Sequence, residues 1–157
     1  MYSHAPVDYI CPFCLLVKGI ENEQVHSKQQ DIIYQDQYIT AFIASHWWPQ
    51  NEGHILIIPN EHIENIYTLS VQLSNRIHEF EIRAARALKK VYECDGVSSR
   101  QHNEPHGSQD VWHYHLHVYP RYEGDNLYGS ERKLSNIEKR KTYSKALREY
   151  IEKHEML

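Results

Sequence analysis

Three histidines occupy alternate positions in the run Trp112-His-Tyr-His-Leu-His-Val-Tyr-Pro120. A β-strand points successive side chains to opposite faces, so this spacing places His113, His115 and His117 on one face, roughly 6.6 Å apart. The intervening apolar residues then face a core on the other side. The run therefore predicts a strand with a candidate active site on its polar face.

Histidine suits such a site because its unperturbed pKa of about 6.5 lets it act as a nucleophile, a proton donor or a metal ligand near neutral pH. Three interpretations follow. A row of surface histidines is disfavoured, because histidine is not a favoured strand residue. A metal site would join two or three imidazoles to a carboxylate or a water. The third interpretation is nucleophilic catalysis at phosphorus.

The run resembles the His-φ-His-φ-His-φ-φ signature of the histidine triad (HIT) superfamily, where φ is an apolar residue. Gln109-Asp-Val-Trp112 is similar to the family's Gln-Ser/Thr-Val-x, and the segment from Gly53 to His62 is similar to its Gly-His-x-Leu-Val-Ile-Pro-x-x-His. The resemblance covers about residues 11 to 122 and points to the Hint-like and diadenosine polyphosphate hydrolase-like branch with a zinc-binding Cys-x-x-Cys. It implies an α+β fold, with an antiparallel β-sheet, a long helix packed across it and an additional C-terminal helix.

The resemblance implies chemistry on nucleoside phosphates. His115 would attack the α-phosphorus, and water would then hydrolyse the nucleotidyl-histidine. His117 would contact the phosphate oxygens or protonate the leaving group, and Gln109 would donate a hydrogen bond to the developing charge. His54 and Asn103 are further candidates for the substrate-binding pocket. The expected substrate is an adenosine derivative, either a dinucleoside polyphosphate or a nucleoside phosphoramidate.

Asp110 departs from the family pattern, which has Ser or Thr at this position. A carboxylate repels a phosphate at close range. Either Asp110 turns away from the pocket, for example to orient a histidine, or the leaving group carries a positive charge. The segment from Phe42 to Ser45 also lacks an equivalent of the Asp or Asn with which family members bind the ribose hydroxyls.

Cys11-Pro-Phe-Cys14 is the second informative motif. The spacing alone fits a redox dithiol or half of a zinc site. A glutaredoxin-like dithiol follows a first strand, whereas the first ten residues here contain Pro6 and predict a loose arm. A closed zinc site needs two more ligands, and similarity to zinc-bearing family members nominates His62 and His113. The zinc would be structural, tying the arm to the histidine run, and no organic cofactor is expected.

The 157 residues are expected to form one domain over 1–157, with the motif-bearing core at about 11–122 and a C-terminal extension over 123–157. A net charge of -4 offers no basic surplus for duplex nucleic acid. No run is apolar enough to span a membrane, and the N-terminus lacks a signal sequence. The cysteine pattern indicates a reducing compartment, so we expect a cytoplasmic protein. The family resemblance also implies a homodimer.

Local patterns predict the order of the elements. Residues 31–35 and 38–44 predict a β-hairpin, and residues 54–58 predict a strand that ends at Pro59. Ser70 is a good N-cap for a helix whose apolar residues recur at steps of three and four up to Val91. Residues 96–101 predict another strand.

A second helix is predicted near the C-terminus. Residues 135–138 match a capping box, with Ser135 as the cap, and the helix is expected to run to about Lys153. The residues expected to be buried are Ile137, Leu147, Tyr150 and Ile151.

Two other functions remain open. A nucleotide-binding or scaffold protein with vestigial activity is favoured by Asp110 and by the missing ribose ligand, and it is opposed by the presence of His115 and His117. A metalloenzyme would use the triad itself as metal ligands. Hydrolysis that survives a chelator, with one zinc that depends on Cys11 or Cys14, would exclude catalysis by a triad-bound ion.

Overall fold

A computed structural model describes residues 2–154, so Met1 and residues 155–157 of the expected domain lie outside the described range. Its centre is an antiparallel five-stranded sheet. The strand order across it is β1 (Ile32–Gln35), β2 (Ile39–Ile43), β4 (Ile55–Pro59), β6 (Leu116–Arg121) and β5 (Gly96–Gln101). Strands β3 (His46–Trp47) and β7 (Lys133–Leu134) form a separate antiparallel pair.

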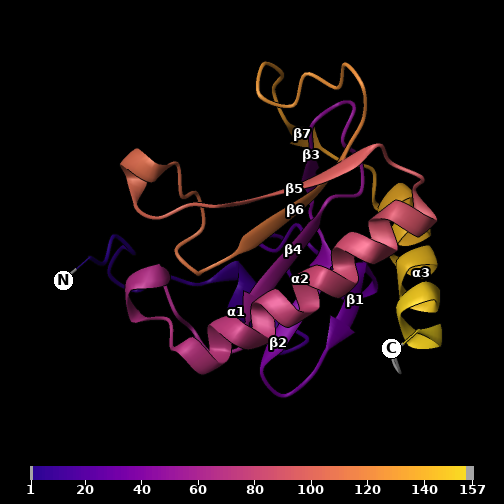
Figure 1. Cartoon of the computed structure of the whole chain (residues 1–157). Helices are drawn as coiled ribbons and strands as arrows, with labels where there is room; N and C mark the ends of the chain where they lie inside the picture. Colours follow the sequence, from indigo (N-terminus) through magenta and orange to yellow (C-terminus); the bar gives the residue numbers. More distant parts are fainter. Residues whose placement is uncertain (1, 155–157) are drawn as a thin grey trace.

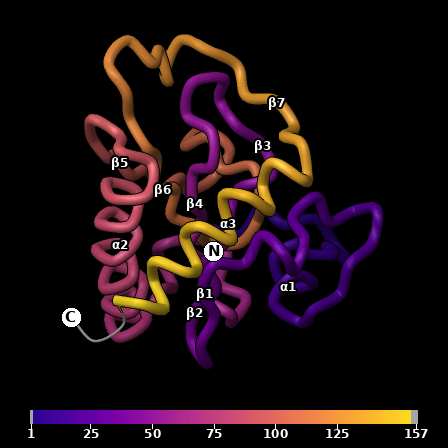
Figure 2. The backbone as a smooth tube through the Cα atoms, turned by 90° about the vertical axis from the view of Figure 1, so that its right-hand side faces the viewer, coloured from indigo at the N-terminus to yellow at the C-terminus, as the bar shows by residue number. Residues whose placement is uncertain are grey.

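Helices lie on both faces of the sheet. The long α2 (Val71–Val91) lies across one face, and the short α1 (Pro12–Val17) lies on the other, as Figure 1 and Figure 2 together show. Helix α3 (Ile137–Lys153) packs beside β1 and against α2. Single-turn 3-10 helices occur at η1 (Gln29–Asp31), η2 (Ile66–Thr68) and η3 (Pro105–Gly107). The predicted α+β fold, with a long helix across an antiparallel sheet and an additional C-terminal helix, is confirmed.

The predicted hairpin forms between β1 and β2. Asp36 closes its turn, because one carboxylate oxygen accepts hydrogen bonds from the backbone N–H groups of Tyr38, at 2.7 Å, and Ile39, at 2.8 Å. Every residue of β2 and of β4 is buried. Their continuous apolar sequences follow from this position, since these strands lie in the middle of a sheet covered on both faces.

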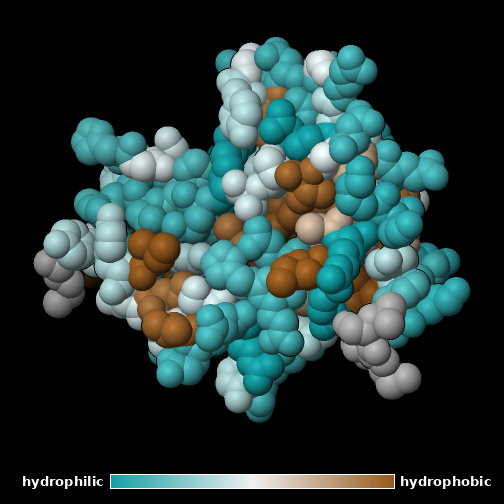
Figure 3. Space-filling model, viewed as in Figure 1, coloured by the Kyte–Doolittle hydropathy of each residue, from teal (hydrophilic) through white to brown (hydrophobic). Residues whose placement is uncertain are grey.

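Helix α2 begins where the sequence predicts. The Ser70 hydroxyl accepts a hydrogen bond from the backbone N–H of Leu73 at 3.2 Å. One stripe of the helix is buried, and it consists of Ile77, Phe80, Ala84, Ala87 and Leu88. The face of the molecule on which α2 lies is mostly hydrophilic, with a few apolar patches (Figure 3). Within residues 2–154, no helix combines the length and apolarity that crossing a membrane requires.

The histidine run differs from its prediction at its start. Strand β6 begins at Leu116, so His113 and His115 precede it and only His117 lies within the sheet. The reason is that the backbone before Leu116 pairs elsewhere: the N–H of His113 donates to the carbonyl of Val111, and the N–H of Tyr114 donates to the carbonyl of Ile63.

The start of α3 also differs from its prediction. Asn136, not Ser135, caps the helix, and its side-chain oxygen accepts from the N–H of Lys139 at 3.0 Å. Ser135 is unavailable as a cap because its N–H and its hydroxyl both donate to the carbonyl of Ser45. Ile137 is 46% exposed, so its predicted burial is wrong. Leu147 and Ile151 are buried as predicted, and Tyr150 is half-buried.

Candidate functional site

A cavity of about 140 Å³ lies on the face of the sheet that carries α1. Residues far apart in the sequence line this cavity. The polar and charged side chains among them include His46, His54, Asp110, His115, His117 and Arg132. Phe13 from α1 and Leu56 from β4 add apolar surface. Leu56 and His117 are direct partners across β4 and β6, so the sheet itself presents both to the cavity.

His115 is held by a hydrogen bond to the backbone of its own run. Its Nδ1 lies 2.7 Å from the carbonyl oxygen of His113, and the ring is 2% exposed. A carbonyl can only accept, so Nδ1 carries the ring proton. The other nitrogen, Nε2, therefore faces the acidic side of the cavity, where the nearest carboxylate oxygen belongs to Asp110.

His117 is paired with His54, which directly precedes the neighbouring strand β4. Nδ1 of His117 lies 3.4 Å from Nε2 of His54, and the two rings are stacked. Nδ1 of His54 is buried and has no hydrogen-bond partner among residues 2–154. An unpaired acceptor costs less than an unpaired N–H, so the shared proton belongs on His54 Nε2. His117 then carries its own proton on Nε2, which suits it to donate a hydrogen bond in the cavity.

Burial keeps both of these rings neutral. It lowers the pKa of His54 to about 3, with the nearby charges of Arg100 and Arg132 acting in the same direction. Burial also lowers the pKa of His117 well below its usual value, and the neighbouring His115 and His54 add to this effect. The pair is therefore uncharged at neutral pH and offers the cavity an N–H hydrogen-bond donor rather than a positive charge.

Asp110 does not leave the pocket. Its Oδ1 lies 3.3 Å from Nε2 of His115, and its Oδ2 lies 2.5 Å from Nη2 of Arg132. Partial burial opposes its ionisation, but the contact with His115 and the ion pair with Arg132 outweigh burial and hold the pKa of Asp110 well below its usual range. Of the two sequence-based alternatives, turning away from the pocket is wrong, and contact with a histidine is observed.

Gln109 is not brought to the cavity. Its side-chain oxygen accepts from the N–H of Glu104 at 2.8 Å, and its NH₂ group donates to the carbonyls of Glu64 and Val111 at 2.6 and 3.0 Å. The amide is thus bound to backbone groups on both sides of it, from Glu64 and from the loop before the histidine run. Its predicted catalytic and substrate-binding roles are not supported by this position, because both polar ends of the amide have partners outside the cavity.

Asn103 is likewise used within that loop. Its side-chain oxygen accepts from the N–H of Ile66, and its NH₂ group donates to Gln101, at 2.8 Å in each case. It does not line the cavity, so the predicted substrate-binding role is not supported by its position. By contrast, sequence reasoning missed His46 and Arg132. Neither lies in a recognisable motif, so no local signal could have found them.

A second cluster combines the two cysteines of the Cys-x-x-Cys motif with His62 and His113. The ligand atoms of all four residues lie within 4.8 Å of one another. Nδ1 of His113 lies 3.3 Å from the sulfur of Cys11, and Nδ1 of His62 lies 3.2 Å from the sulfur of Cys14. The sequence-predicted set of four is therefore brought together in space.

The chemistry of this cluster fits a tetrahedral zinc ion. Sulfur and nitrogen ligands of one zinc are expected to lie about 3.6 Å apart, from the usual bond lengths and a tetrahedral angle, and Cys14 Sγ lies 3.6 Å from His113 Nδ1. Nε2 of His113 lies 2.9 Å from the carbonyl of Pro59, so this nitrogen holds the proton and Nδ1 is free to bind a metal. Burial lowers the pKa of His113 to about 4, which keeps the ring neutral.

Helix α1 joins the cysteine cluster to the cavity. Cys11 is the N-cap of this helix, and its sulfur accepts from the N–H of Cys14 at 3.4 Å. The Phe13 ring then packs edge-on against both His113 and His115. Burial raises the pKa of the Cys11 thiol to about 12, so without a metal ion this thiol stays protonated at neutral pH.

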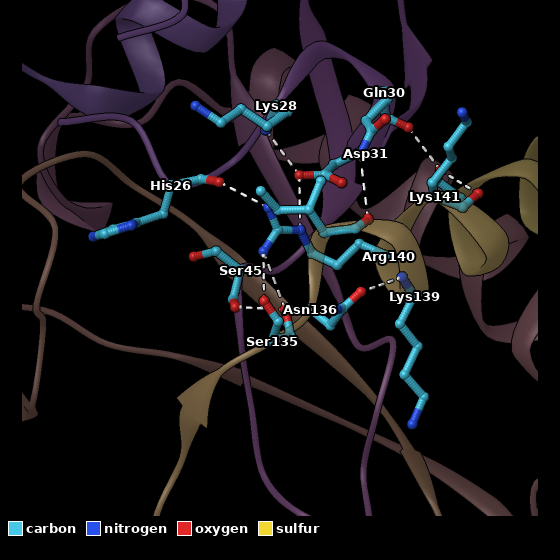
Figure 4. A network of polar contacts seen from close by, with 12 residues as sticks. His26, Lys28, Gln30, Asp31, Ser45, Ser135, Asn136, Lys139, Arg140 and Lys141 are labelled. Carbon is cyan, nitrogen blue, oxygen red and sulfur yellow. Dashed lines mark hydrogen bonds and ion pairs between the residues drawn. The ribbon is translucent and has the colours of Figure 1, made fainter. Parts of the chain in front are cut away.

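A buried ion pair holds the C-terminal extension, residues 123–157, against the segment that precedes β1. Figure 4 shows Arg140 of α3 in the centre of this network, with its Nε 3.0 Å from a carboxylate oxygen of Asp31. Arg140 also donates to the carbonyls of His26 and Ser135. Both ion-pair partners are at most 1% exposed. His26 lines the cavity, so this network fixes one of its walls.

Comparisons with known proteins agree with the resemblance seen in the sequence. A family model described as "HIT domain" matches residues 25–124. "Protein hit" of Bacillus subtilis (strain 168) is 31% identical over 118 residues, which cover 74% of this chain and 75% of that protein. The "Purine nucleoside phosphoramidase" of Escherichia coli (strain K12) is 35% identical over 89 residues, 56% of this chain and 73% of the relative.

A solved structure extends the similarity to most of the chain. The crystal structure of a Zn-bound histidine triad family protein from Mycobacterium smegmatis aligns with a TM-score of 0.74 and 26% sequence identity. The alignment covers 92% of this chain and 95% of that one.

The buried His54 generates a prediction about pH. Its pKa is about 3 in the folded chain and about 6.5 in an unfolded one. Between these values the unfolded chain binds more protons, so the free energy of unfolding is highest above pH 6.5 and falls as the pH is lowered. His54→Phe removes the titrating group. We therefore expect its free energy of unfolding to fall by about 1 to 2 kcal/mol less than that of the wild type when the pH is lowered from 8 to 5.

Urea denaturation of the metal-loaded protein at both pH values measures this difference. His106→Gln is the matched control, because His106 is exposed and should leave the pH dependence unchanged. Equal pH dependence in the wild type and His54→Phe would show that His54 is not held neutral.

Proposed function

Since the chain belongs to the HIT domain family, we propose that it is a nucleotidyl hydrolase that attacks the α-phosphate of a nucleoside phosphate derivative. The observation that carries this proposal is the orientation of His115. Its Nδ1 is tethered to the His113 carbonyl, which directs Nε2 toward the cavity. A nucleophilic imidazole needs one nitrogen tethered and the other free to approach the phosphorus.

The reaction proceeds in two displacements. In the first, the lone pair of His115 Nε2 forms a bond to phosphorus, the bond from phosphorus to the leaving group breaks, and the leaving atom takes a proton from solvent while the Nε2–H of His117 donates a hydrogen bond to the phosphate oxygens. In the second, a water attacks the phosphorus and releases its proton to solvent, and the bond between nitrogen and phosphorus breaks. His54 acts as a positioning residue, because its pairing with His117 sets which nitrogen carries the proton.

The proposed substrate is an adenosine phosphoramidate, with a dinucleoside polyphosphate as the second candidate. One observation supports this order: the relative from Escherichia coli is a purine nucleoside phosphoramidase.

Trapping the covalent intermediate tests the nucleophile. We expect wild-type protein, mixed with an adenosine phosphoramidate labelled at phosphorus and then denatured rapidly, to carry label on His115. We expect His115→Ala to show no label and to hydrolyse the substrate at least roughly a thousandfold more slowly than the wild type, since the nucleophile acts in both steps. Peptide mapping and a steady-state assay make the two measurements.

His106→Ala is the control for the loss of an imidazole, because His106 is exposed and lies outside the cavity. It should retain wild-type turnover. Hydrolysis by His115→Ala at the wild-type rate would refute the assignment of the nucleophile.

A second candidate function is a nucleotide-binding protein with vestigial activity. The specific observation in its favour is that Asp110 already contacts Nε2 of His115, the atom that would attack. Under this alternative the wild type binds AMP, but no phosphorus is found on His115 in the trapping experiment. The use of the whole triad as catalytic metal ligands is less well supported, because His113 lies with the cysteines while His115 and His117 line the cavity.

We also propose that Cys11, Cys14, His62 and His113 hold a structural zinc ion. The support is the spacing of the four ligand atoms and the hydrogen bond that leaves Nδ1 of His113 free. When bound, the ion would supply a cross-link between the N-terminal arm and the histidine run. No step of the proposed reaction depends on it.

Metal analysis tests the zinc site. We expect one zinc per chain in the wild type and its loss in Cys14→Ser, with a lower midpoint of thermal unfolding because metal binding contributes folding free energy. Cys94→Ala is the matched control, since Cys94 is a free cysteine far from the cluster in sequence. It should keep its zinc. A Cys14→Ser variant with a full equivalent of zinc would contradict the ligand set.

A homodimer is proposed on the family resemblance and on one structural observation. Strand β5 forms an edge of the sheet, and an unpaired edge offers hydrogen-bonding groups to a second strand. Light scattering should give twice the mass of the chain, and a monomer at micromolar concentration would contradict the proposal. The proposed location is the cytoplasm, because the cysteine cluster requires reduced thiols. One domain over residues 1–157 likewise stays a proposal.

A further inference from the structure

Arg132 reaches the cavity from outside the motif-bearing part of the chain. It directly precedes β7, whose residues Lys133 and Leu134 pair with Trp47 and His46 of β3. This strand pair and the hydrogen bonds from Ser135 to the carbonyl of Ser45 anchor the segment. The guanidinium group is thus placed at the cavity by pairing between two distant segments.

The Asp110 carboxylate connects this guanidinium to the nucleophile. One oxygen lies 2.5 Å from Arg132 and the other lies 3.3 Å from His115 Nε2. A reacting atom in a near-attack geometry lies about 3 to 3.5 Å from its nucleophile. The Asp110 oxygen therefore occupies the place at which a phosphate must stand for His115 to attack it.

A phosphate and this carboxylate cannot occupy that place together. Two anions in contact repel each other strongly at a partly buried site. Asp110 is 37% exposed at its side chain, so it has room to rotate toward solvent. Within residues 2–154, Asp110 is the acid that forms an ion pair with Arg132, so its departure leaves this guanidinium ready for another anion.

We propose that the Asp110 carboxylate occupies the position of the substrate phosphate in the empty cavity and is displaced when substrate binds. Arg132 then exchanges its ion pair with Asp110 for an ion pair with the phosphate. This inference rests on the proposed function and adds a binding residue from the C-terminal extension to it. A guanidinium suits the role because it presents several donors to the oxygens of a phosphate. The Asp110 carboxylate keeps the guanidinium and the His115 ring paired while the cavity holds no nucleotide.

Binding of AMP and adenosine to the zinc-loaded full chain tests the role of Arg132. We expect Arg132→Gln to weaken AMP binding about tenfold, the change typical of one charge-assisted contact at a partly exposed site. Adenosine affinity should be unchanged, because adenosine has no phosphate. Lys133→Gln is the matched control: it removes the neighbouring positive charge, which does not line the cavity, and should change AMP affinity less than twofold.

Asp110→Asn tests the displacement. Because no carboxylate has to be displaced, we expect this variant to bind AMP several-fold more tightly than the wild type. In this variant Arg132 has no ion pair with Asp110 to give up when it binds the phosphate. Arg132→Gln should therefore reduce AMP affinity more in the Asp110→Asn background than in the wild type. Titration calorimetry gives all four dissociation constants of this cycle, and circular dichroism shows whether each variant is folded.

Two results would overturn the inference. AMP affinity that is equal in the wild type and Arg132→Gln would mean that the ion pair with Asp110 stays closed in the complex. Weaker AMP binding by Asp110→Asn would mean that Asp110 assists binding. If the wild type is labelled on His115 while either result holds, this inference fails and the proposed function stands. If the wild type neither binds AMP nor accepts label, both fail.

Discussion

The hydrogen bond from His115 Nδ1 to the carbonyl of His113 is the contact on which the arrangement of the site depends. That carbonyl belongs to a residue whose ring is held on both sides, by the cysteines at one nitrogen and by the Pro59 carbonyl at the other. His113 is thus both a proposed metal ligand, through its ring, and the residue that orients His115, through its carbonyl group. A metal at the cysteine cluster would stiffen the nucleophile without approaching the substrate.

The C-terminal extension is an integral part of the cavity wall. Arg140 and Asp31 form an ion pair away from solvent, and removing one partner of such a pair costs about 3 to 5 kcal/mol because the other charge stays buried. The same guanidinium binds the carbonyls of His26 and Ser135. It therefore joins the segment before β1 to the segment that delivers Arg132, and the site is shaped by residues from both ends of the chain.

Local patterns predicted the elements well wherever one interaction dominates. The turn at Asp36 and the cap at Ser70 form as expected, because each depends on hydrogen bonds within four residues. The predicted cap at Ser135 was wrong because a distant segment competes for the same group: the Ser135 hydroxyl donates to the carbonyl of Ser45. Gln109 is held away from the cavity by the backbone of Glu64, Glu104 and Val111.

By itself, the sequence determined the family, the order of the main strands and of the two long helices, and, through the family resemblance, the histidines and cysteines that cluster. Only the tertiary structure decided that Asp110 lies against His115 and that Gln109 and Asn103 stay out of the cavity. It also decided that Arg132 belongs to the site. The physical reason is that strand pairing and a buried ion pair bring together residues whose separation in sequence carries no signal.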